Sequence, residues 1–384
     1  MRRVSRIALA AAFPLILAAG NPGHVYFQRL ADPQLDRFTN SPNSSQKQWF
    51  RDRFFRMAVF SPYFDAKTSW YPNSLLYNNL YGIEPDSSFA REHPDWILHD
   101  QGGHLLYIPF ACEGGVCPHY AADIANPAFR AQWIAQMSDL LRRFRYRGLW
   151  IDDVNLEFRV SDGYGKQTAP IDSATHRPMT WEAWRNYVAG FTEQIRRALP
   201  NVEIAQNPIW YAAPGRDSDP AVRRQIRTAD NINIERGIAG DNGLTGGTGE
   251  WSLNALFSFI DRVHAAGPGV TLEEYSPDLR GKQYSLAGYF LISNGNDRIG
   301  DDSNPETWWE GYDVELGQPL GPRTWNNGVY SRRFAKGMVL LGEPGLQTRE
   351  IPLNSTFTTL DGSSVTSVRL SARQGIVLRI PPAR

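Results

Sequence analysis

The chain has 384 residues, of which 42% are hydrophobic and 21% charged, and its 40 basic side chains balance 40 acidic ones. This is the usage of a globular protein, and it excludes a disordered, collagenous or polytopic membrane chain. The formal net charge of zero gives no reason to expect a nucleic acid or an anionic membrane as partner. The 12 Trp, 16 Tyr and 19 Phe residues stand out, because aromatic side chains in such numbers serve a large core or flat surfaces for ligands.

The first twenty residues have the layout of a secretory signal peptide. Arg2, Arg3 and Arg6 precede an apolar run over 7–19 that ends in small residues. A run of about 13 apolar residues is shorter than the roughly 20 needed to span a bilayer, so cleavage is favoured over an N-terminal anchor helix. We therefore expect residues 1–20 to be removed and the protein to be exported, periplasmic or extracellular, without membrane contact afterwards.

Cys112 and Cys117 are the only two cysteines. In an oxidising compartment such a pair can close a loop. A metal site is the weaker interpretation, because no pair of histidines accompanies the two thiols. We expect a structural disulfide.

From about residue 56 to residue 300, short apolar runs alternate with helical patterns, which is typical of a parallel sheet or barrel. The predicted strands cover 57–64, 105–109, 148–154, 202–207, 231–235, 270–275 and 297–300. The predicted helices cover 127–144, 180–199, 220–229, 253–263 and 284–293. Seven or eight units result. No glycine-rich phosphate loop follows the first strand, so we expect a (β/α)₈ TIM barrel over 21–322 rather than an open doubly wound sheet.

The pattern changes from about residue 323. Strand-like runs such as 338–341, 365–370 and 375–380 follow one another, separated by Gly, Asn and Pro. This predicts a small antiparallel, β-sandwich-like domain over 323–384. Its role stays open.

Alternation along two strands indicates which carboxylates face the barrel interior. In the strands that end in Asp152 and Glu235, Leu and Ile occupy alternate positions and must face the surrounding helices. Trp150 and Asn233 then face inward together with these two acids. If the strands are the fourth and sixth, the two carboxylates meet at the C-terminal rim, where barrel enzymes place their chemistry. A facing pair of carboxyl groups is the minimum apparatus for cleaving a glycosidic bond.

Other residues are candidates for the same rim. Asp153 is the alternative nucleophile, because strand ends twist. Glu203 also faces inward, but near the start of its strand, where a buried ion pair is the better interpretation. The candidate substrate-binding residues are Tyr63, Asp65, Trp70, Tyr107, Trp150, Asn155, Asn207, Trp210, Tyr211, Asn233, Glu273 and Glu274. For the aromatic ones, loop packing is an equally good interpretation. No HxH, HExxH or Gly-x-Ser-x-Gly motif occurs, so we expect no metal and no cofactor.

Four stretches carry a resemblance to a known family: FSPYFD, DIANP, GLWIDDVN and NINIERG. They resemble the glycoside-hydrolase-like TIM-barrel family numbered fifteen, which is similar to the endo-α-1,4-polygalactosaminidase and α-galactosidase superfamily. The resemblance covers residues 50–300. It implies an aspartate nucleophile on strand four and an acid on strand six as proton donor, which correspond to Asp152 and Glu235. The Asp-Asp doublet leaves Asp153 open as the nucleophile.

Together these patterns predict a secreted glycoside hydrolase that cleaves a poly- or oligosaccharide by a two-carboxylate, retaining mechanism. The alternative is a non-hydrolytic carbohydrate-binding barrel, in which the carboxylates only accept hydrogen bonds from sugar hydroxyls. A third class, a metal-dependent phosphodiesterase with Asp152 and Asp153 as ligands, would lose activity with a chelator. The sugar, the linkage, endo or exo action and the oligomeric state stay open.

Overall fold

The computed structural model describes residues 20–30, 33–35, 40–67, 69–208, 218–240, 243–275 and 278–381. The predicted signal peptide lies outside these ranges except for Gly20. Among the helices of these ranges, none is long and apolar enough to cross a membrane.

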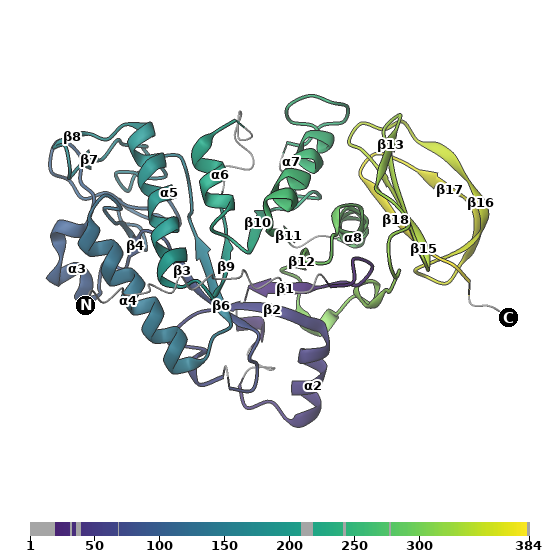
Figure 1. Ribbon diagram of the computed structural model, residues 1–384, viewed down its shortest axis with the longest axis horizontal. Helices are drawn as coiled ribbons and strands as arrows, with labels where there is room; N and C mark the ends of the chain where they lie inside the picture. The colour runs from purple at the N-terminus through teal and green to yellow at the C-terminus, as the bar shows by residue number, and fades with distance from the viewer. Residues whose placement is uncertain are drawn as a thin grey trace, which may run out of the picture.

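Eight parallel strands close into a barrel, with neighbours in chain order around it (Figure 1). They are β1 (Phe27–Leu30), β2 (Phe54–Val59), β3 (Ser74–Asn79), β6 (Gly148–Asp152), β9 (Glu203–Gln206), β10 (Asn231–Glu235), β11 (Gly269–Glu274) and β12 (Arg298–Asp301). The predicted TIM barrel is therefore confirmed. β6 and β10 are its fourth and sixth strands, as the sequence predicts.

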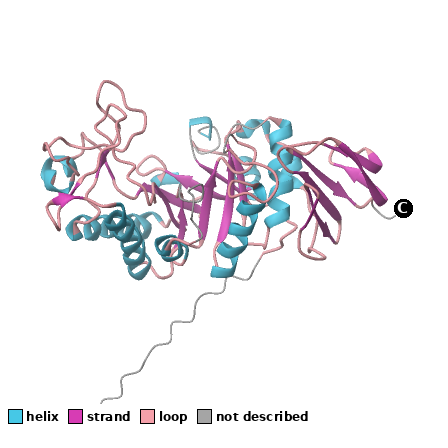
Figure 2. Ribbon diagram, turned by 90° about the horizontal axis from the view of Figure 1, so that it is seen from above, coloured by secondary structure: helices cyan, strands magenta, loops and turns pink. Residues whose placement is uncertain are grey.

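The helices surround these strands (Figure 2). They are α2 (Ser44–Arg53), α3 (Ser88–Glu92), α4 (Pro127–Phe144), α5 (Trp181–Ala198), α6 (Pro220–Ile226), α7 (Leu253–Ala266) and α8 (Leu279–Ile292). Polar caps fix where the long helices begin. The side chain of Asn126, which precedes α4, accepts from two backbone N–H groups in the first turn of that helix, and the side chain of Thr180 accepts from the backbone N–H of Ala183 in α5. Pro127 occupies the first turn of α4, where its missing N–H costs no hydrogen bond.

Two barrel strands differ from the sequence prediction. β1 and β3 are not predicted, because polar residues interrupt their apolar pattern: Gln28 and Arg29 are buried in β1, and β3 ends in Tyr-Asn-Asn. The predicted strand over 105–109 is wrong as a barrel strand. It lies in the connection between β3 and α4, where Tyr107 pairs only in isolated bridges.

The connections after β3 and β6 are long and extend the C-terminal rim of the barrel. Each contains a small two-stranded sheet: β4 (Gly82–Ile83) pairs with β5 (Tyr120–Ala121), and β7 (Ile171–Asp172) pairs with β8 (Arg177–Pro178). The two connections also pair with each other, because Tyr107 and Ser161 exchange two backbone hydrogen bonds of 2.9 Å. At this rim the two connections therefore form one hydrogen-bonded structure rather than separate loops.

The predicted alternation of side chains is confirmed. Leu149, Ile151, Ile232 and Ile234 belong to the main apolar core outside the barrel. The barrel interior holds a separate small cluster formed by Ala58, Leu75, Trp150 and Ala205. The residues between the outward Leu and Ile side chains, Asp152 and Glu235 among them, therefore face inward.

A buried ion cluster closes the N-terminal end of the barrel. Glu203 accepts hydrogen bonds from Arg56 (Nε to Oε1, 2.9 Å) and from Arg147 and Arg298. Glu203, Arg56 and Arg298 are 7%, 6% and 5% exposed. Burial raises the pKa of Glu203, but the attraction of Arg298 and Arg56 outweighs burial and lowers this pKa to about 2. The predicted buried ion pair is confirmed, and Glu203 interacts with three arginines rather than one.

The C-terminal strands form a separate antiparallel sheet. They are β13 (Thr324–Asn326), β14 (Val329–Phe334), β15 (Gly337–Gly342), β16 (Arg349–Thr359), β17 (Ser364–Leu370) and β18 (Gln374–Arg379), in the order β13-β14-β15-β18-β16-β17. The sheet folds around its own apolar cluster of Met338, Leu340, Phe357, Val368, Leu370 and Leu378. The predicted small antiparallel β domain is confirmed.

Helix α8 lies between this sheet and the barrel and packs on both (Figure 1). Its residues from Tyr284 to Ile292 are all buried, because one side of the helix packs on the barrel and the other on β15 and β18. Gly375 permits the close approach of β18, since a Cβ atom there would lie 2.4 Å from the carbonyl oxygen of Gln283.

Candidate active site

A cavity of about 620 Å³ opens at the C-terminal ends of the barrel strands. This volume lies within the roughly 300–1,000 Å³ of small-molecule sites. Asp152 from β6, Glu235 from β10 and Glu273 from β11 all line it, together with Asn207, which follows β9. The structure thus places the two predicted catalytic carboxylates in one cavity.

One amide group joins the two carboxylates. Nδ2 of Asn207 donates to Oδ1 of Asp152 and to Oε2 of Glu235, each at 2.9 Å. A trigonal NH₂ group directs its two hydrogens about 120° apart, so two acceptors at that distance stand about 5 Å from each other. A single nitrogen atom therefore bridges the two carboxylates.

Two tyrosines hold the outer oxygens of the pair. The hydroxyl of Tyr77 donates to Oδ2 of Asp152 at 2.6 Å, and the hydroxyl of Tyr275 donates to Oε1 of Glu235. Burial, together with the neighbouring charge of Asp153, raises the pKa of Asp152 to about 6, although hydrogen bonds from Tyr77 and Asn207 oppose the rise. Burial also raises the pKa of Tyr77, so this hydroxyl keeps its proton and acts as a donor.

A second polar layer orients Asn207. Nδ2 of Asn233 donates to Oδ1 of Asn207 at 2.9 Å and to Oε2 of Glu273 at 2.6 Å. Because Oδ1 of Asn207 is the acceptor in the first bond, its NH₂ group must face the two carboxylates. Burial raises the pKa of Glu273 to about 7, and the charges of Glu235 and Asp152 add to the rise against the bond from Asn233.

Asp153 lines the same cavity but is engaged differently. Its backbone has a φ of 54°, which turns its side chain away from the direction that an extended strand would give. Its Oδ1 accepts from Arg159 at 2.7 Å and from Asn155 at 2.9 Å, and its Oδ2 accepts from Asn79. Asp153 is thus held by a cation and two amides.

The remaining predicted rim residues fall into two groups. Trp150, Asn207 and Glu273 line the cavity, and Asn233 lies directly behind it through its two hydrogen bonds. Asn155 is completely buried and bonds to Asp153, so it supports the site without lining it.

Glu274 is not part of the cavity lining. It is 1% exposed, and its oxygens accept from the backbone N–H groups of Ile238, Ala239 and Gly240. These residues follow β10, so Glu274 anchors the chain just beyond Glu235. Parity explains the placement, because Glu273 faces inward and its neighbour must face outward.

Four further candidates lie in surrounding loops and do not line the cavity. Tyr63 is 50% exposed and its ring lies beneath the ammonium of Lys67. Asp65 accepts from the hydroxyl of Tyr146, and Trp70 packs on the rings of Phe50 and Tyr71. The ring of Tyr107 lies against that of Tyr120. Trp210 and Tyr211 lie outside the described residues.

The sequence reasoning misses several residues that line the cavity. They include Phe60, Tyr77, Asn79, Phe110, Arg159 and Tyr275. The missing signal for Tyr77 and Asn79 is β3 itself: once that strand is recognised, alternation from the inward Leu75 places both side chains inside. Phe110 and Tyr275 lie beyond the strands, where alternation gives no guidance.

The predicted disulfide between Cys112 and Cys117 is present. In the part of the chain that the structure describes, no group of three or more His, Cys, Asp or Glu side chains is arranged to hold a metal ion.

The solved structures that match the chain include glycoside hydrolases. The maltogenic α-amylase AmyB from Thermotoga neapolitana matches at 12% identity and a TM-score of 0.55, over 94% of this chain and 99% of that one. An α-amylase from Geobacillus thermoleovorans matches at 10% identity and a TM-score of 0.50, over 93% and 98%. The glycoside hydrolase domain of PelA from Pseudomonas aeruginosa matches at 16% identity and a TM-score of 0.42, over 74% and 96%. The likenesses to the two α-amylases show a shared fold and nothing beyond it.

None of the curated proteins is significantly similar to the chain in sequence. The family profile described as hypothetical glycosyl hydrolase family 15 matches residues 62–338. This range takes in the strands and connections from β3 to β14, including both cavity carboxylates. The chain therefore belongs to hypothetical glycosyl hydrolase family 15, and it is a glycoside hydrolase built on a TIM barrel.

Proposed function

We propose that the protein is an exported glycoside hydrolase that cleaves a poly- or oligosaccharide with retention of anomeric configuration. The observation that carries the proposal is the single amide of Asn207 between the carboxylates of Asp152 and Glu235. By trigonal geometry, the two oxygens that this amide bonds stand about 5 Å apart, which fits the roughly 5–5.5 Å of retaining enzymes and not the roughly 6.5–9.5 Å that an inverting pair needs for its water.

In the first step, the ionised carboxylate of Asp152 attacks the anomeric carbon while Glu235 gives its proton to the leaving oxygen. The glycosidic bond breaks and a covalent bond between the sugar and Asp152 forms. In the second step, Glu235 takes a proton from water, the water oxygen attacks the anomeric carbon, and the carboxylate of Asp152 leaves.

We assign the nucleophile to Asp152 rather than Asp153. The Oδ1 atom of Asp153 accepts a charge-assisted bond from Arg159, which withdraws electron density and leaves less for attack. Among the described residues, the donors to Asp152 are neutral: Tyr77, Asn207 and a backbone N–H.

Trp150 and Glu273 are proposed to contact the sugar at the scissile bond, since they line the cavity beside the pair. Asn207 and Asn233 act as positioning residues, because they hold the carboxylates and each other. The disulfide supports export, as such bonds persist in oxidising compartments. N-terminal sequencing of secreted protein tests the cleavage after residue 20.

Azide trapping of the two variants tests the mechanism. With an activated aryl glycoside and sodium azide, Glu235→Ala should form a glycosyl azide of retained configuration, and Asp152→Ala one of inverted configuration, both identified by NMR. Asp153→Asn should keep measurable hydrolysis without azide. Rescue of Asp153→Ala in place of Asp152→Ala would move the nucleophile to Asp153.

The alternative function, a non-hydrolytic carbohydrate-binding barrel, leads to a different expected result. It predicts that wild type, Asp152→Asn and Glu235→Gln release reducing ends from a polysaccharide panel at the same background rate. Loss of release in both variants, with retained polysaccharide binding, is the result that the hydrolase proposal requires.

A further inference from the structure

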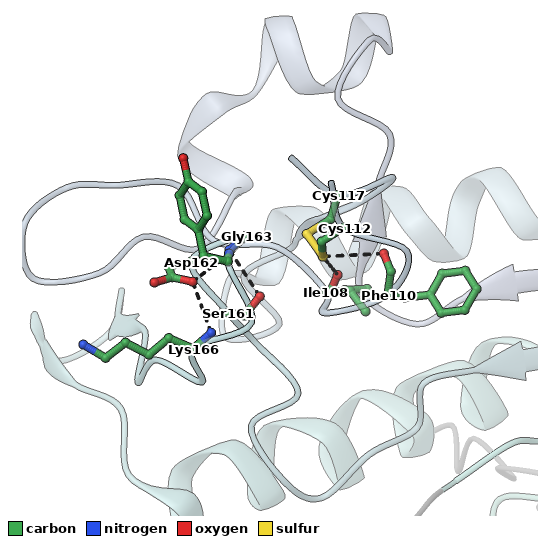
Figure 3. The surroundings of a disulfide bond; sticks show 9 residues. Ile108, Phe110, Cys112, Cys117, Ser161, Asp162, Gly163 and Lys166 are labelled. Atoms are coloured by element: carbon green, nitrogen blue, oxygen red, sulfur yellow. Dashed lines mark hydrogen bonds between the residues drawn. A yellow bond between two sulfur atoms is a disulfide. The ribbon is translucent and has the colours of Figure 1, made fainter. Parts of the chain in front are cut away.

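The connection between β3 and α4 carries a tip closed by the disulfide, over residues 108–119, here called the disulfide tip (Figure 3). At its base, the backbone N–H of Ile108 donates to the carbonyl of His119 at 3.1 Å. Inside the ring that Cys112 and Cys117 close, Glu113 and Val116 exchange two backbone hydrogen bonds. The tip is therefore tied both covalently and by its backbone.

The turn over 161–166 supports the disulfide tip from one side. A Cβ atom on Gly163 would lie 2.3 Å from the carbonyl oxygen of Gly115, and one on Gly115 would lie 2.4 Å from the ring of Tyr164. Such close approach is possible only because both positions are glycine. The disulfide ring thus presses against a neighbouring connection that is itself part of the rim.

Phe110 extends from the other side of the tip, away from that turn (Figure 3). It lines the catalytic cavity and is 61% exposed. Two other exposed aromatic residues line the cavity, and both have partners: Phe60 packs on the ring of Tyr77 at 4.6 Å, and Tyr275 bonds to Glu235. Phe110 makes no ring contact with any residue in the described ranges.

Phe110 offers a large exposed aromatic ring within a cavity that both apolar and polar side chains line, and this combination is typical of ligand sites. Sugar rings offer a matching surface, because their C–H faces are apolar while their hydroxyls point outward, and flat aromatic rings pack on such faces. Phe110 belongs to the rim connection rather than to a barrel strand, so it lies outside the layer that holds Asp152 and Glu235.

We propose that Phe110 is a stacking platform for a sugar unit beyond the one at the scissile bond, and that the Cys112–Cys117 disulfide positions this platform. The inference rests on the proposed function and deepens it: the substrate class is a glycan chain rather than a single glycoside. Asp152 and Glu235 cleave the glycosidic bond, and Phe110 makes the enzyme prefer longer glycan chains.

Binding is measured first, in the catalytically inactive Asp152→Asn protein, so that the platform is tested without relying on turnover. The probes are polygalactosamine, galactan, soluble starch and dextran in affinity electrophoresis. At least one polymer should retard Asp152→Asn, and adding Phe110→Ala should weaken that retardation about tenfold. Val116→Ala is the matched control, because Val116 is 57% exposed on the same tip but does not line the cavity. Equal retardation with and without Phe110, or no retardation by any of the four polymers, overturns the platform.

Kinetics then separate stacking from general damage. On oligosaccharides of the retarding polymer, Phe110→Ala should raise KM with kcat little changed, and the rise should grow from disaccharide to hexasaccharide. Phe110→Tyr should restore wild-type KM. A uniform fall in kcat for every chain length would instead indicate a structural role and would overturn the proposal.

The role of the disulfide is tested by the double variant Cys112→Ser/Cys117→Ser. It should reproduce the length-dependent KM increase of Phe110→Ala, and combining the three substitutions should add less than twofold, because the platform is already lost. Additive effects would refute the coupling between disulfide and platform. If no protein hydrolyses any probe while Phe110-dependent binding persists, the hydrolase proposal fails and the platform stands.

Discussion

Replacing Glu203 by Gln should remove a defined, pH-dependent part of the free energy of unfolding. The carboxyl pKa falls from its ordinary 4.5 to about 2 in the folded protein, because the attraction of Arg298 and Arg56 outweighs burial. At about 1.4 kcal/mol per pKa unit, this shift contributes about 3 kcal/mol of stability. Glu203 is only 7% exposed, so solvent screening reduces this contribution little.

The sign of the pH dependence follows from the lowered pKa. The stabilisation is fully present above pH 4.5 and is lost as the pH falls toward 2, since the unfolded chain then binds a proton that the folded chain resists. About 2 kcal/mol should be gone by pH 3. Glu203→Gln lacks this titration and leaves Arg56 and Arg298 buried without a counter-charge, which costs about 3–5 kcal/mol at neutral pH.

Urea unfolding followed by tryptophan fluorescence between pH 3 and pH 7 measures both quantities. The gap in unfolding free energy between wild type and Glu203→Gln should be about 3 kcal/mol or more at pH 7 and should shrink to about half at pH 3. Glu182→Gln is the control, because Glu182 is exposed in the first turn of α5. A gap that stays constant over this range would refute the assignment of the ion cluster as the source of the shift.

Three further outcomes concern the cavity. Burial raises the pKa of Asp152 from 3.8 to about 6, so ionisation of this carboxyl destabilises the fold as the pH rises through that range. Asp152→Asn should therefore raise the unfolding free energy at pH 8 by about 1–3 kcal/mol. Thermal unfolding at pH 5 and pH 8 checks this, and an increase of the same size at pH 3 would contradict it. In the proposed mechanism Asp152 must be ionised to attack, so kcat/KM should fall below about pH 6. Asp153→Asn should move this acid limb to lower pH, because the charge of Asp153 is the second cause of the raised pKa of Asp152. An unmoved limb in a pH-rate profile would show that Asp153 does not act on Asp152. Glu274→Ala should lower the unfolding free energy by about 1–3 kcal/mol, because it leaves buried backbone N–H groups unpaired. It should also lower kcat more than an equally destabilising substitution elsewhere. An unchanged kcat would mean that the chain after β10 positions Glu235 without the hydrogen bonds to Glu274.

The sequence predicts the catalytic end of the barrel best where strands are apolar on one face. Alternation in β6 and β10 places Asp152 and Glu235 inside because Leu and Ile mark the outer face unambiguously. The same rule fails for β3, whose inward residues Tyr77 and Asn79 are polar and interrupt the pattern that would reveal the strand. Polar residues that line the cavity thus make their own strand difficult to recognise in the sequence.

Contacts that depend on tertiary structure escape the sequence altogether. The pairing of Glu274 with backbone N–H groups after β10 needs the neighbouring strand to be in register. Phe110 is 61% exposed on the disulfide tip, and the tip meets the turn over 161–166 only in the folded chain. Neither leaves a periodic signal, because both involve irregular connections whose shape comes from packing and not from local preference.

The amide that separates the two carboxylates is also protected from chemical ageing. Asparagine side chains hydrolyse spontaneously when the backbone nitrogen of the next residue attacks the side-chain carbonyl and closes a five-membered imide. The residue after Asn207 is Pro208, whose ring nitrogen carries no hydrogen to lose. The cyclisation is blocked, so a neutral group remains between the two acids and no further negative charge arises there.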